Sequence, residues 1–285
     1  MLVIGPGYLG KLLATNLLKD GDEVHTLSRN DPGIVGTSHF SCDIRFPFSL
    51  KNNYDLVYYL VSASGYSEKA YQDAYYHGLD HALKAVLQMK TKPFFVFASS
   101  TSLFKENSGG QVVEDSQISL HPISRALADG ESLLLESGVH SSVLRFSGIY
   151  GPKRDRLAVQ VARGEASLRQ KASISNRIHL FDAVGILKFI SELSDPKPMY
   201  LVCDNMPSPY NEILVWLSQL LIEKKHLDYE LPDTMHRRIS NKFCSNRLIR
   251  KEGYDFLFPS FKEGFLQIIN ESNYLRGVYE TNGQA

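Results

Sequence analysis

The sequence predicts an α/β protein built on a doubly wound parallel sheet, with a small C-terminal part. Three observations support this fold class. A glycine-rich segment, GPGYLG at residues 5–10, stands between a short apolar run and an amphipathic stretch. Strand-like and helix-like segments then alternate at the spacing of βαβ units. No internal repeat or low-complexity segment interrupts them. Together these features indicate a Rossmann-type fold.

The first strand, the glycine turn and the first helix form a dinucleotide-binding pattern. Gly5 permits a tight turn, Gly7 lets the backbone approach a pyrophosphate, and Gly10 lets the helix pack close to the strand. Leucines follow at helical spacing, which supports a helix there: Leu9, Leu12, Leu13, Leu17 and Leu18. We therefore expect the cofactor to contact Gly5, Gly7, Tyr8, Leu9 and Gly10.

The second strand, Glu23–Leu27, ends in a segment that bears on cofactor choice. An NAD site usually has an acidic residue here that accepts from the ribose 2'-hydroxyl. This chain instead has Ser28 and Arg29. Because an arginine can pair with a 2'-phosphate and a serine can donate to it, NADP is expected to be preferred over NAD. The alternative is that Arg29 is a solvated loop residue.

The remaining elements of the sheet follow in alternation along the chain. The strands are expected at His39–Cys42, Asp55–Val61, Pro93–Ser100 and Ser141–Phe146, and the helices at Ser67–Met89 and Pro122–Glu136. Ligands of such sheets lie beyond the carboxyl ends of the strands. The hydroxyl cluster that begins at Ser99 and Ser100 is therefore expected to face the site.

Composition excludes several other classes of protein. The chain has 285 residues and a formal net charge of zero, so it lacks the electrostatic footprint of a nucleic-acid-binding protein. No apolar run is long enough to span a bilayer and no signal-peptide pattern begins the chain, so we expect a cytoplasmic protein. The cysteines Cys42, Cys203 and Cys244 are too few and too widely spaced for a disulfide framework or a zinc knuckle.

Four segments together resemble one known family. GPGYLG, FVFASSTSLF, LRFSGIYGP at residues 144–152 and NRIHLFDAV at residues 176–184 occur in this order. In this the chain resembles the extended short-chain dehydrogenase/reductases of the NAD-dependent epimerase/dehydratase type. The resemblance implies a nicotinamide cofactor and often a nucleotide-sugar substrate. It also implies that Asp43 and Ile44 flank the adenine, and that Val61 and Ser62 lie against the cofactor. Ser99, at the carboxyl end of its strand, is expected to contact the cofactor as well.

The chain departs from this family where the family's proton donor should be. The resemblance implies a Ser or Thr, a Tyr, and a Lys four residues after the Tyr. Ser100 matches the first, but the Tyr position falls on Ile123 and the Lys position on Leu127. No Tyr in the chain has a Lys four residues later. The chain thus resembles the atypical members of the family, which lack the Tyr-Lys pair.

Any chemistry would need an acid from elsewhere. The candidates are Tyr150, His179, Ser124 and Arg125. Tyr150 follows the strand near which the nicotinamide should lie, although a structural or substrate-lining role is the alternative. His179 could titrate near neutrality, although a packing role is the alternative.

Two functions remain open at this point. One is an NADP-dependent oxidoreductase or epimerase-like enzyme that acts on a polar, possibly nucleotide-sugar, substrate. The other is a catalytically silent NADP-binding sensor or scaffold. We expect residues 1–150 to form the NAD(P)-binding core and residues 151–285 to form a mixed substrate-binding region that contributes late strands and helices. A homodimer through the helices at Ser67–Met89 and Pro122–Glu136 is also expected from the resemblance.

Overall fold

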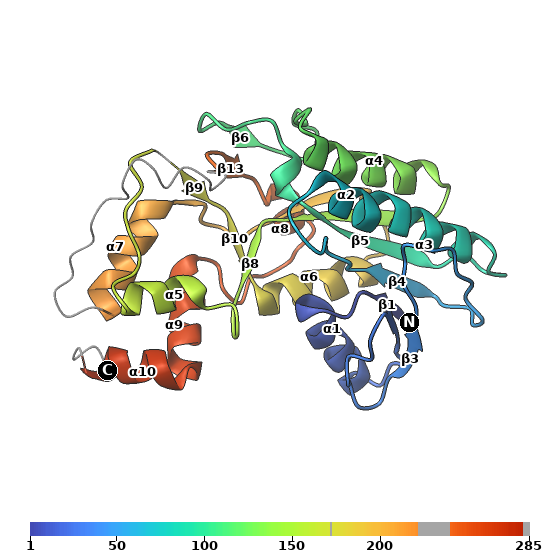
Figure 1. The fold of residues 1–285 in the computed structure, drawn as a ribbon, viewed down its shortest axis with the longest axis horizontal. Coiled ribbons are helices and arrows are strands. Elements are labelled where there is room, and N and C mark those ends of the chain that lie inside the picture. The colour runs from blue at the N-terminus through green and yellow to red at the C-terminus, as the bar shows by residue number, and fades with distance from the viewer. Residues whose placement is uncertain (172, 222–239, 282–285) are drawn as a thin grey trace. The chain divides into compact units, whose positions relative to one another are not determined.

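The computed structural model describes residues 1–171, 173–221 and 240–281. Contacts divide the chain into two compact units (Figure 1). The first unit contains Met1–Lys105, Ser116–Phe146 and Ala183–Val202, and the second contains the rest of the described chain. The expected functional boundary at residue 150 stays a prediction, because it concerns what each part binds.

The first unit is built on a seven-stranded sheet with the order β11-β7-β5-β4-β1-β2-β3. All neighbouring strands are parallel. The strands are β1 (Leu2–Ile4), β2 (His25–Ser28), β3 (Ser38–Ser41), β4 (Leu56–Tyr59), β5 (Phe94–Ser100), β7 (Ser141–Phe146) and β11 (Met199–Val202). The order reverses beside β1, which is the switch point of a doubly wound sheet. The predicted fold class is confirmed.

Helices cover both faces of this sheet (Figure 1). They are α1 (Tyr8–Lys19), α2 (Glu68–Tyr71), α3 (Gly78–Leu87), α4 (Pro122–Glu136) and α6 (Leu180–Glu192). Tyr58 and Tyr59 of β4 point to opposite faces of the sheet, because successive side chains of a strand alternate between its two faces. The Tyr58 hydroxyl lies 2.9 Å from Ser191 Oγ on α6, whereas the Tyr59 hydroxyl donates to the Ala74 carbonyl 2.6 Å away.

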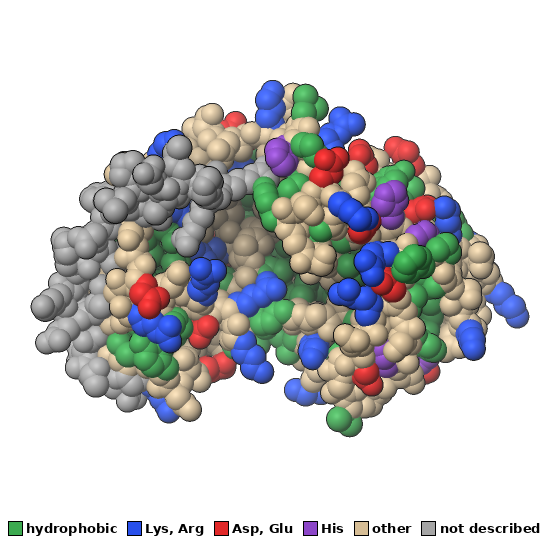
Figure 2. All heavy atoms as spheres, in the orientation of Figure 1, with side chains coloured by type: hydrophobic (Ala, Val, Ile, Leu, Met, Phe, Trp, Pro, Cys, Tyr) green, Lys and Arg blue, Asp and Glu red, His purple; other side chains and the backbone are tan. Residues whose placement is uncertain are grey.

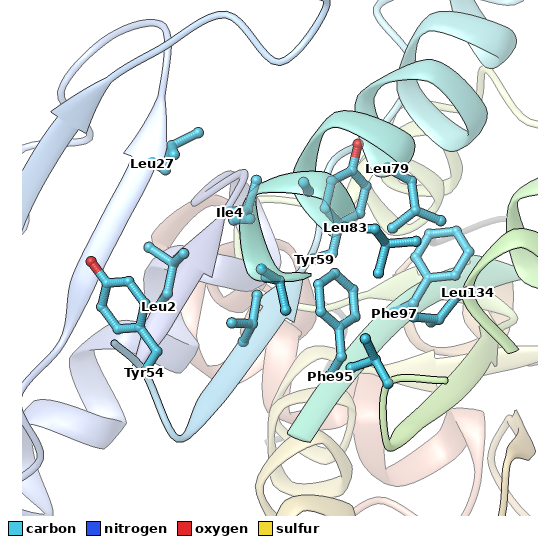
Figure 3. Close-up of a cluster of buried hydrophobic side chains, with 14 of the residues drawn as sticks. Leu2, Ile4, Leu27, Tyr54, Tyr59, Leu79, Leu83, Phe95, Phe97 and Leu134 are labelled. Carbon is cyan, nitrogen blue, oxygen red and sulfur yellow. The ribbon is translucent and has the colours of Figure 1, made fainter. Parts of the chain in front are cut away.

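The apolar core on the side of α3 and α4 contains large buried side chains of β1, β4 and β5. Figure 3 shows Leu2, Ile4, Tyr59, Phe95 and Phe97 packed with Leu79, Leu83 and Leu134 from the helices. This close packing between sheet and helices holds the carboxyl ends of the strands in fixed positions.

The helix predicted at Ser67–Met89 contains a turn that the sequence does not predict. Residues Gln72–His77 form a π-helix, η1, between α2 and α3. Its widened turn is closed by the amide of Gly78, which donates to the Asp73 carbonyl. A β-carbon on Gly130 of α4 would lie 1.9 Å from the Tyr75 carbonyl oxygen. The glycine therefore lets α4 pack directly against the π-helix.

A buried ion pair connects α4 to the sheet. Glu131 and Arg145 are each about 3% exposed at their side chains, and Arg145 Nη2 lies 2.6 Å from Glu131 Oε2. The Ser99 hydroxyl donates to Glu131 Oε1 over 2.5 Å. The Arg145 guanidinium also lies 5.0 Å from the centre of the Phe104 ring. One carboxylate on α4 thus joins residues of β5 and β7.

The second unit consists mainly of helices around a separate apolar cluster. Its helices are α5 (Arg156–Ala162), α7 (Tyr210–Leu221), α8 (Arg247–Lys251), α9 (Phe261–Glu271) and α10 (Asn273–Thr281). Its short strands pair as β8 (Gly148–Tyr150) with β10 (Arg177–His179), β9 (Ile174–Ser175) with β12 (Ser208–Pro209), and β6 (Gln111–Val112) with β13 (Phe243–Cys244). In neither unit does a described helix have the length and hydropathy needed to cross a membrane.

We expect Glu131→Gln to lower the free energy of unfolding by roughly 3–5 kcal/mol, because it leaves the Arg145 charge buried without a counterion. Urea denaturation at neutral pH measures this. Glu136→Gln, at an exposed position on the same helix, is the control and should stay within about 0.5 kcal/mol of the wild type. Equal stabilities for the two variants would contradict the structural role of the pair.

Candidate functional site

A pocket of about 450 Å³ lies in the first unit at the carboxyl ends of β1, β2 and β4. Eight of the predicted cofactor-binding residues line it: Gly5, Gly7, Ser28, Arg29, Asp43, Ile44, Val61 and Ser62. Four others, Tyr8, Leu9, Gly10 and Ser99, are not among its lining residues. That these residues bind a cofactor stays a prediction, but the structure brings most of them to one cavity.

The glycine turn at this pocket has the geometry that a dinucleotide requires. Gly5 has a φ of +80°, and a β-carbon there would lie 2.8 Å from the Val61 nitrogen. A β-carbon on Gly10 would lie 3.1 Å from the Gly5 carbonyl oxygen, so this glycine allows close packing of α1. At Gly7 the nearest atom would be 4.0 Å away, which leaves the backbone open toward the pocket. The turn therefore fits a pyrophosphate at the start of α1.

The end of β2 forms the corner where a ribose 2'-substituent is expected. Arg29 is exposed and lines the pocket. Ser28 also lines it, and its hydroxyl donates to the Asn30 carbonyl over 2.7 Å. Since a hydroxyl has a single proton to donate, Ser28 would have to turn away from Asn30 before it could donate to a phosphate.

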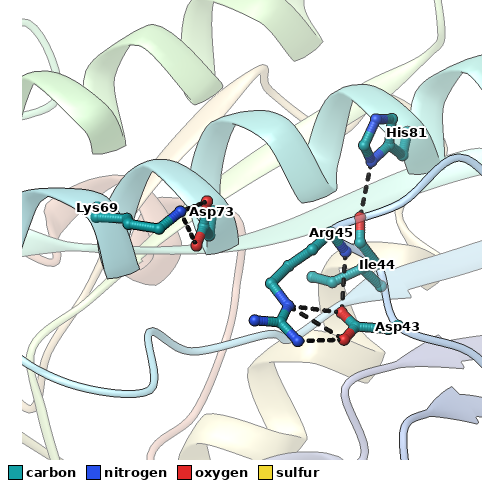
Figure 4. Close-up of polar contacts among 6 residues, drawn as sticks. All are labelled: Asp43, Ile44, Arg45, Lys69, Asp73 and His81. Atoms are coloured by element: carbon teal, nitrogen blue, oxygen red, sulfur yellow. Dashed lines mark hydrogen bonds and ion pairs between the residues drawn. The ribbon is translucent and has the colours of Figure 1, made fainter.

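The loop after β3 also lines the pocket, and Figure 4 shows the contacts of its residues Asp43, Ile44 and Arg45. Asp43 is held by Arg45, whose Nη2 donates to its Oδ2 over 2.6 Å. This hydrogen bond is the main reason why the pKa of Asp43 is lowered. The Ile44 carbonyl lies 2.8 Å from His81 Nδ1 on α3. A β-carbon on Gly78 would lie 2.5 Å from Ile44 Cδ1, so the glycine lets α3 approach this loop.

Sequence reasoning missed several residues of the pocket. Lys11 and Arg45 line it, and each directly follows a residue that the sequence did identify. A cation beside the predicted phosphate turn was a usable signal for Lys11, whereas Arg45 follows the two residues that the resemblance places at the adenine. Asp73 and Ala74 also line the pocket, from the π-helix. No sequence signal marked them, because the sequence predicted an ordinary α-helix there.

The first turns of α4 carry apolar residues where the resemblance places the Tyr-Lys pair. Ile123 is 4% exposed and Leu127 is fully buried. Ser124 is also fully buried, and its Oγ has no hydrogen-bond partner within the described part of the chain. Arg125 is exposed, with its Nε 3.9 Å from Asp129 Oδ1. No tyrosine or lysine of α4 is therefore available for proton transfer.

Ser100 ends β5 and caps the short 3-10 helix η2, Thr101–Leu103. Its Oγ accepts from the Ser102 amide over 3.1 Å and donates to Ser102 Oγ over 3.0 Å. It belongs to the first unit, as does Ser124. Its role in catalysis stays a prediction.

Tyr150 and His179 lie together in the second unit, in register on β8 and β10. Their ring centres are 5.3 Å apart. The Tyr150 hydroxyl donates to the Ser260 carbonyl over 3.4 Å, and burial raises its pKa. Burial lowers the pKa of His179 to about 4, although its hydrogen bond to Gln267 acts in the other direction. His179 is therefore neutral at pH 7, and both residues have the contacts of packed side chains.

Two charged groups of the second unit are buried without full pairing. Arg177 Nε and Asp204 Oδ2 lack a hydrogen-bond partner among the residues described. The other carboxylate oxygen of Asp204 accepts from the Met206 amide over 3.0 Å. Burial raises the pKa of Asp204 to about 7, and burial lowers the pKa of Arg177. Asp204 is thus the carboxyl that would titrate near neutral pH.

This gives a pH-dependent prediction for Asp204→Asn. Because the folded-state pKa of about 7 lies above the usual aspartate pKa of 3.8, the folded carboxyl retains its proton where the unfolded one has lost it. The free energy of unfolding of the wild type should therefore decrease as the pH rises from about 4 to about 7. The Asn variant should gain about 2–3 kcal/mol relative to the wild type between pH 5 and 8.

Chemical denaturation of both proteins at pH 5 and at pH 8 measures this difference in the free energy of unfolding. Asp115→Asn, at an exposed position of the same unit, is the control and should follow the wild type. Parallel pH profiles for wild type and Asp204→Asn would contradict the prediction.

Comparison with known proteins gives one family. Its sequence profile, described as the NAD dependent epimerase/dehydratase family, matches residues 1–172. A search of curated proteins gives no match. A candidate NAD-dependent epimerase/dehydratase of Methylobacillus flagellatus is 26% identical, with 94% of this chain and 97% of that one covered and a TM-score of 0.78.

Two further solved structures share the fold. The UDP-glucose 4-epimerase of Thermotoga maritima, solved with UDP-glucose, is 16% identical over 94% of this chain and 96% of its own, with a TM-score of 0.77. The enzyme WbmG of Bordetella bronchiseptica, solved with NAD, is 14% identical over 94% and 92%, with a TM-score of 0.78. Since the family profile covers more than half of the 285 residues, the chain belongs to the NAD-dependent epimerase/dehydratase family.

Proposed function

We propose that the protein binds NADP and acts as an oxidoreductase or epimerase-like enzyme on a polar substrate of the nucleotide-sugar kind. The observation that carries the proposal is the pocket itself. It combines the open Gly7 backbone at the start of α1 with Arg29 at the end of β2. The first fits a pyrophosphate, and the second supplies a cation where an NAD site usually has a carboxylate.

The substrate class is supported by what related structures hold. Solved structures of this fold contain UDP-glucose in one case and UDP-glucuronic acid with NAD in another. For this chain, Ser100 would orient the substrate oxygen, and the cofactor when bound would supply hydride chemistry. Ser124, Tyr150 and His179 remain the candidates for proton transfer, with His179 restricted to its neutral form at pH 7.

A silent NADP-binding sensor is the second candidate, and one observation favours it. Ile123 and Leu127 are buried where the Tyr-Lys pair of the family would stand. A protein that binds the cofactor without turning it over does not need that pair. Under either function the homodimer stays a proposal, supported by the partly exposed Leu87 on α3 and Leu135 on α4.

We expect Arg29→Ala to weaken NADPH binding by about tenfold, through loss of a charged hydrogen bond to the 2'-phosphate, and to change NADH binding by less than about twofold. Titration followed by nucleotide fluorescence measures both. Lys84→Ala is the control, since Lys84 is exposed on α3 and pairs with Asp80 outside the pocket. Equal losses for the two nucleotides would show that Arg29 does not recognise the 2'-phosphate.

Turnover separates the enzyme from the sensor. NADPH-loaded protein mixed with nucleotide sugars and carbonyl compounds should oxidise the cofactor with at least one of them, as followed by absorbance of the reduced nicotinamide. Ser100→Ala should then lower kcat by about 10²-fold or more while NADPH affinity is kept. Tight NADPH binding without turnover across these substrates would favour the sensor, and absence of binding would reject both functions.

A further inference from the structure

Five charged side chains alternate in sign along one side of the nucleotide pocket. We name Arg29, Asp43, Arg45, Asp73 and Lys69 the rim charges. Four of them line the pocket, and Lys69 pairs with Asp73 at 3.1 Å (Figure 4). Arg29 adds to the lowering of the Asp43 pKa, and Asp73 adds to the raising of the Arg45 pKa. Each charge therefore acts on its neighbour in the series.

Among the rim charges, Asp43 is a negative charge in the pocket that would have to accept the negatively charged 2'-phosphate of NADP. Its carboxylate lines the same pocket as Arg29, to which the proposed function assigns the 2'-phosphate. A phosphate monoester carries a charge of about −1.5 to −2 at pH 7. An unpaired carboxylate in the same pocket would repel this group and so lower the affinity for NADP relative to NAD.

Arg45 donates to both oxygens of that carboxylate. Its Nε lies 3.0 Å from Asp43 Oδ1 and 3.1 Å from Oδ2, and its Nη2 lies 2.6 Å from Oδ2. The Arg45 amide adds a contact of 3.1 Å to Oδ1. These four contacts come from three N–H groups of Arg45, because the Nε–H is shared between the two oxygens, and each carboxylate oxygen accepts at least two of the contacts. The pair therefore presents itself to the pocket as a neutral unit.

Contacts with α3 fix the backbone between Asp43 and Arg45 and so hold the ion pair at the pocket. His81 contacts the Ile44 carbonyl between the two residues, and Gly78 leaves room for the Ile44 side chain (Figure 4). Both supports come from α3. The side chains of Arg45 and Asp43 are 51% and 24% exposed, so a ligand in the pocket would meet them directly.

We propose that Arg45 is a specificity-determining residue for NADP, which acts by neutralising Asp43 so that the pocket accepts a 2'-phosphate beside Arg29. The proposal rests on the proposed NADP function. It assigns to Arg29 the direct recognition of the phosphate and to Arg45 the removal of a repulsion. If Arg45 acts by neutralising Asp43, a second substitution that removes the Asp43 charge should restore the affinity that Arg45→Ala loses.

The test measures binding of adenosine 2',5'-bisphosphate and of 5'-AMP by calorimetry, since these two ligands differ only in the 2'-phosphate. Arg45→Ala should weaken binding of the bisphosphate by about three- to tenfold and of 5'-AMP by less than about twofold. In the double variant Asp43→Asn with Arg45→Ala, the ratio of the two affinities should return to within about twofold of the wild type. Added salt should shrink the effect of Arg45→Ala, because the pair is partly exposed.

Three results would overturn the proposal. One is an unchanged affinity ratio in Arg45→Ala, and another is an equal loss with and without Asp43→Asn, which would indicate direct contact between Arg45 and the phosphate. The third is a loss that does not respond to salt. Lys84→Ala is the control for removal of an ion-paired cation from the same unit. Failure of the proposed function is distinguishable, since the wild-type protein would then show no preference for the bisphosphate over 5'-AMP.

Discussion

The buried contact between Glu131 and Arg145 is the constraint on which the arrangement of the first unit depends. A carboxylate and a guanidinium that are each about 3% exposed can be stable only if each satisfies the other. Here the carboxylate also accepts from Ser99, at the end of β5. The position of α4 on the sheet is thereby tied to the two strands beside it, and α4 in turn supports the π-helix through Gly130.

The π-helix that α4 supports also lines the pocket at the carboxyl ends of β1, β2 and β4. The π-helix supplies Asp73 and Ala74 to the pocket wall, and the Tyr59 hydroxyl holds the Ala74 carbonyl from below. On the face drawn in Figure 2, Lys and Arg side chains are scattered among acidic and uncharged ones. Because the chain also has a formal net charge of zero, an anionic ligand would be recognised by individually placed cations rather than by a large positive field.

Much of the fold could be predicted from the sequence, and the limits have physical causes. β7 and α4 are found at their predicted bounds, because a fully buried parallel strand and an amphipathic helix leave strong periodic signals. The glycine turn was readable because each glycine has a separate steric task. The π-helix could not be predicted, because the residues that contact it, Tyr59 and Gly130, are distant from it in the sequence. The Arg45–Asp43 pair was missed because pairing is a property of side-chain placement.

The π-helix also determines which side chains of this segment face the pocket. A π-turn amounts to one residue inserted into an α-helix, and one residue corresponds to about 100° of rotation about the helix axis. The insertion lets Asp73 face the pocket while Gly78, five residues later, still faces Ile44. In an unbroken α-helix, five residues correspond to about 500° of rotation, so the two positions would face directions about 140° apart.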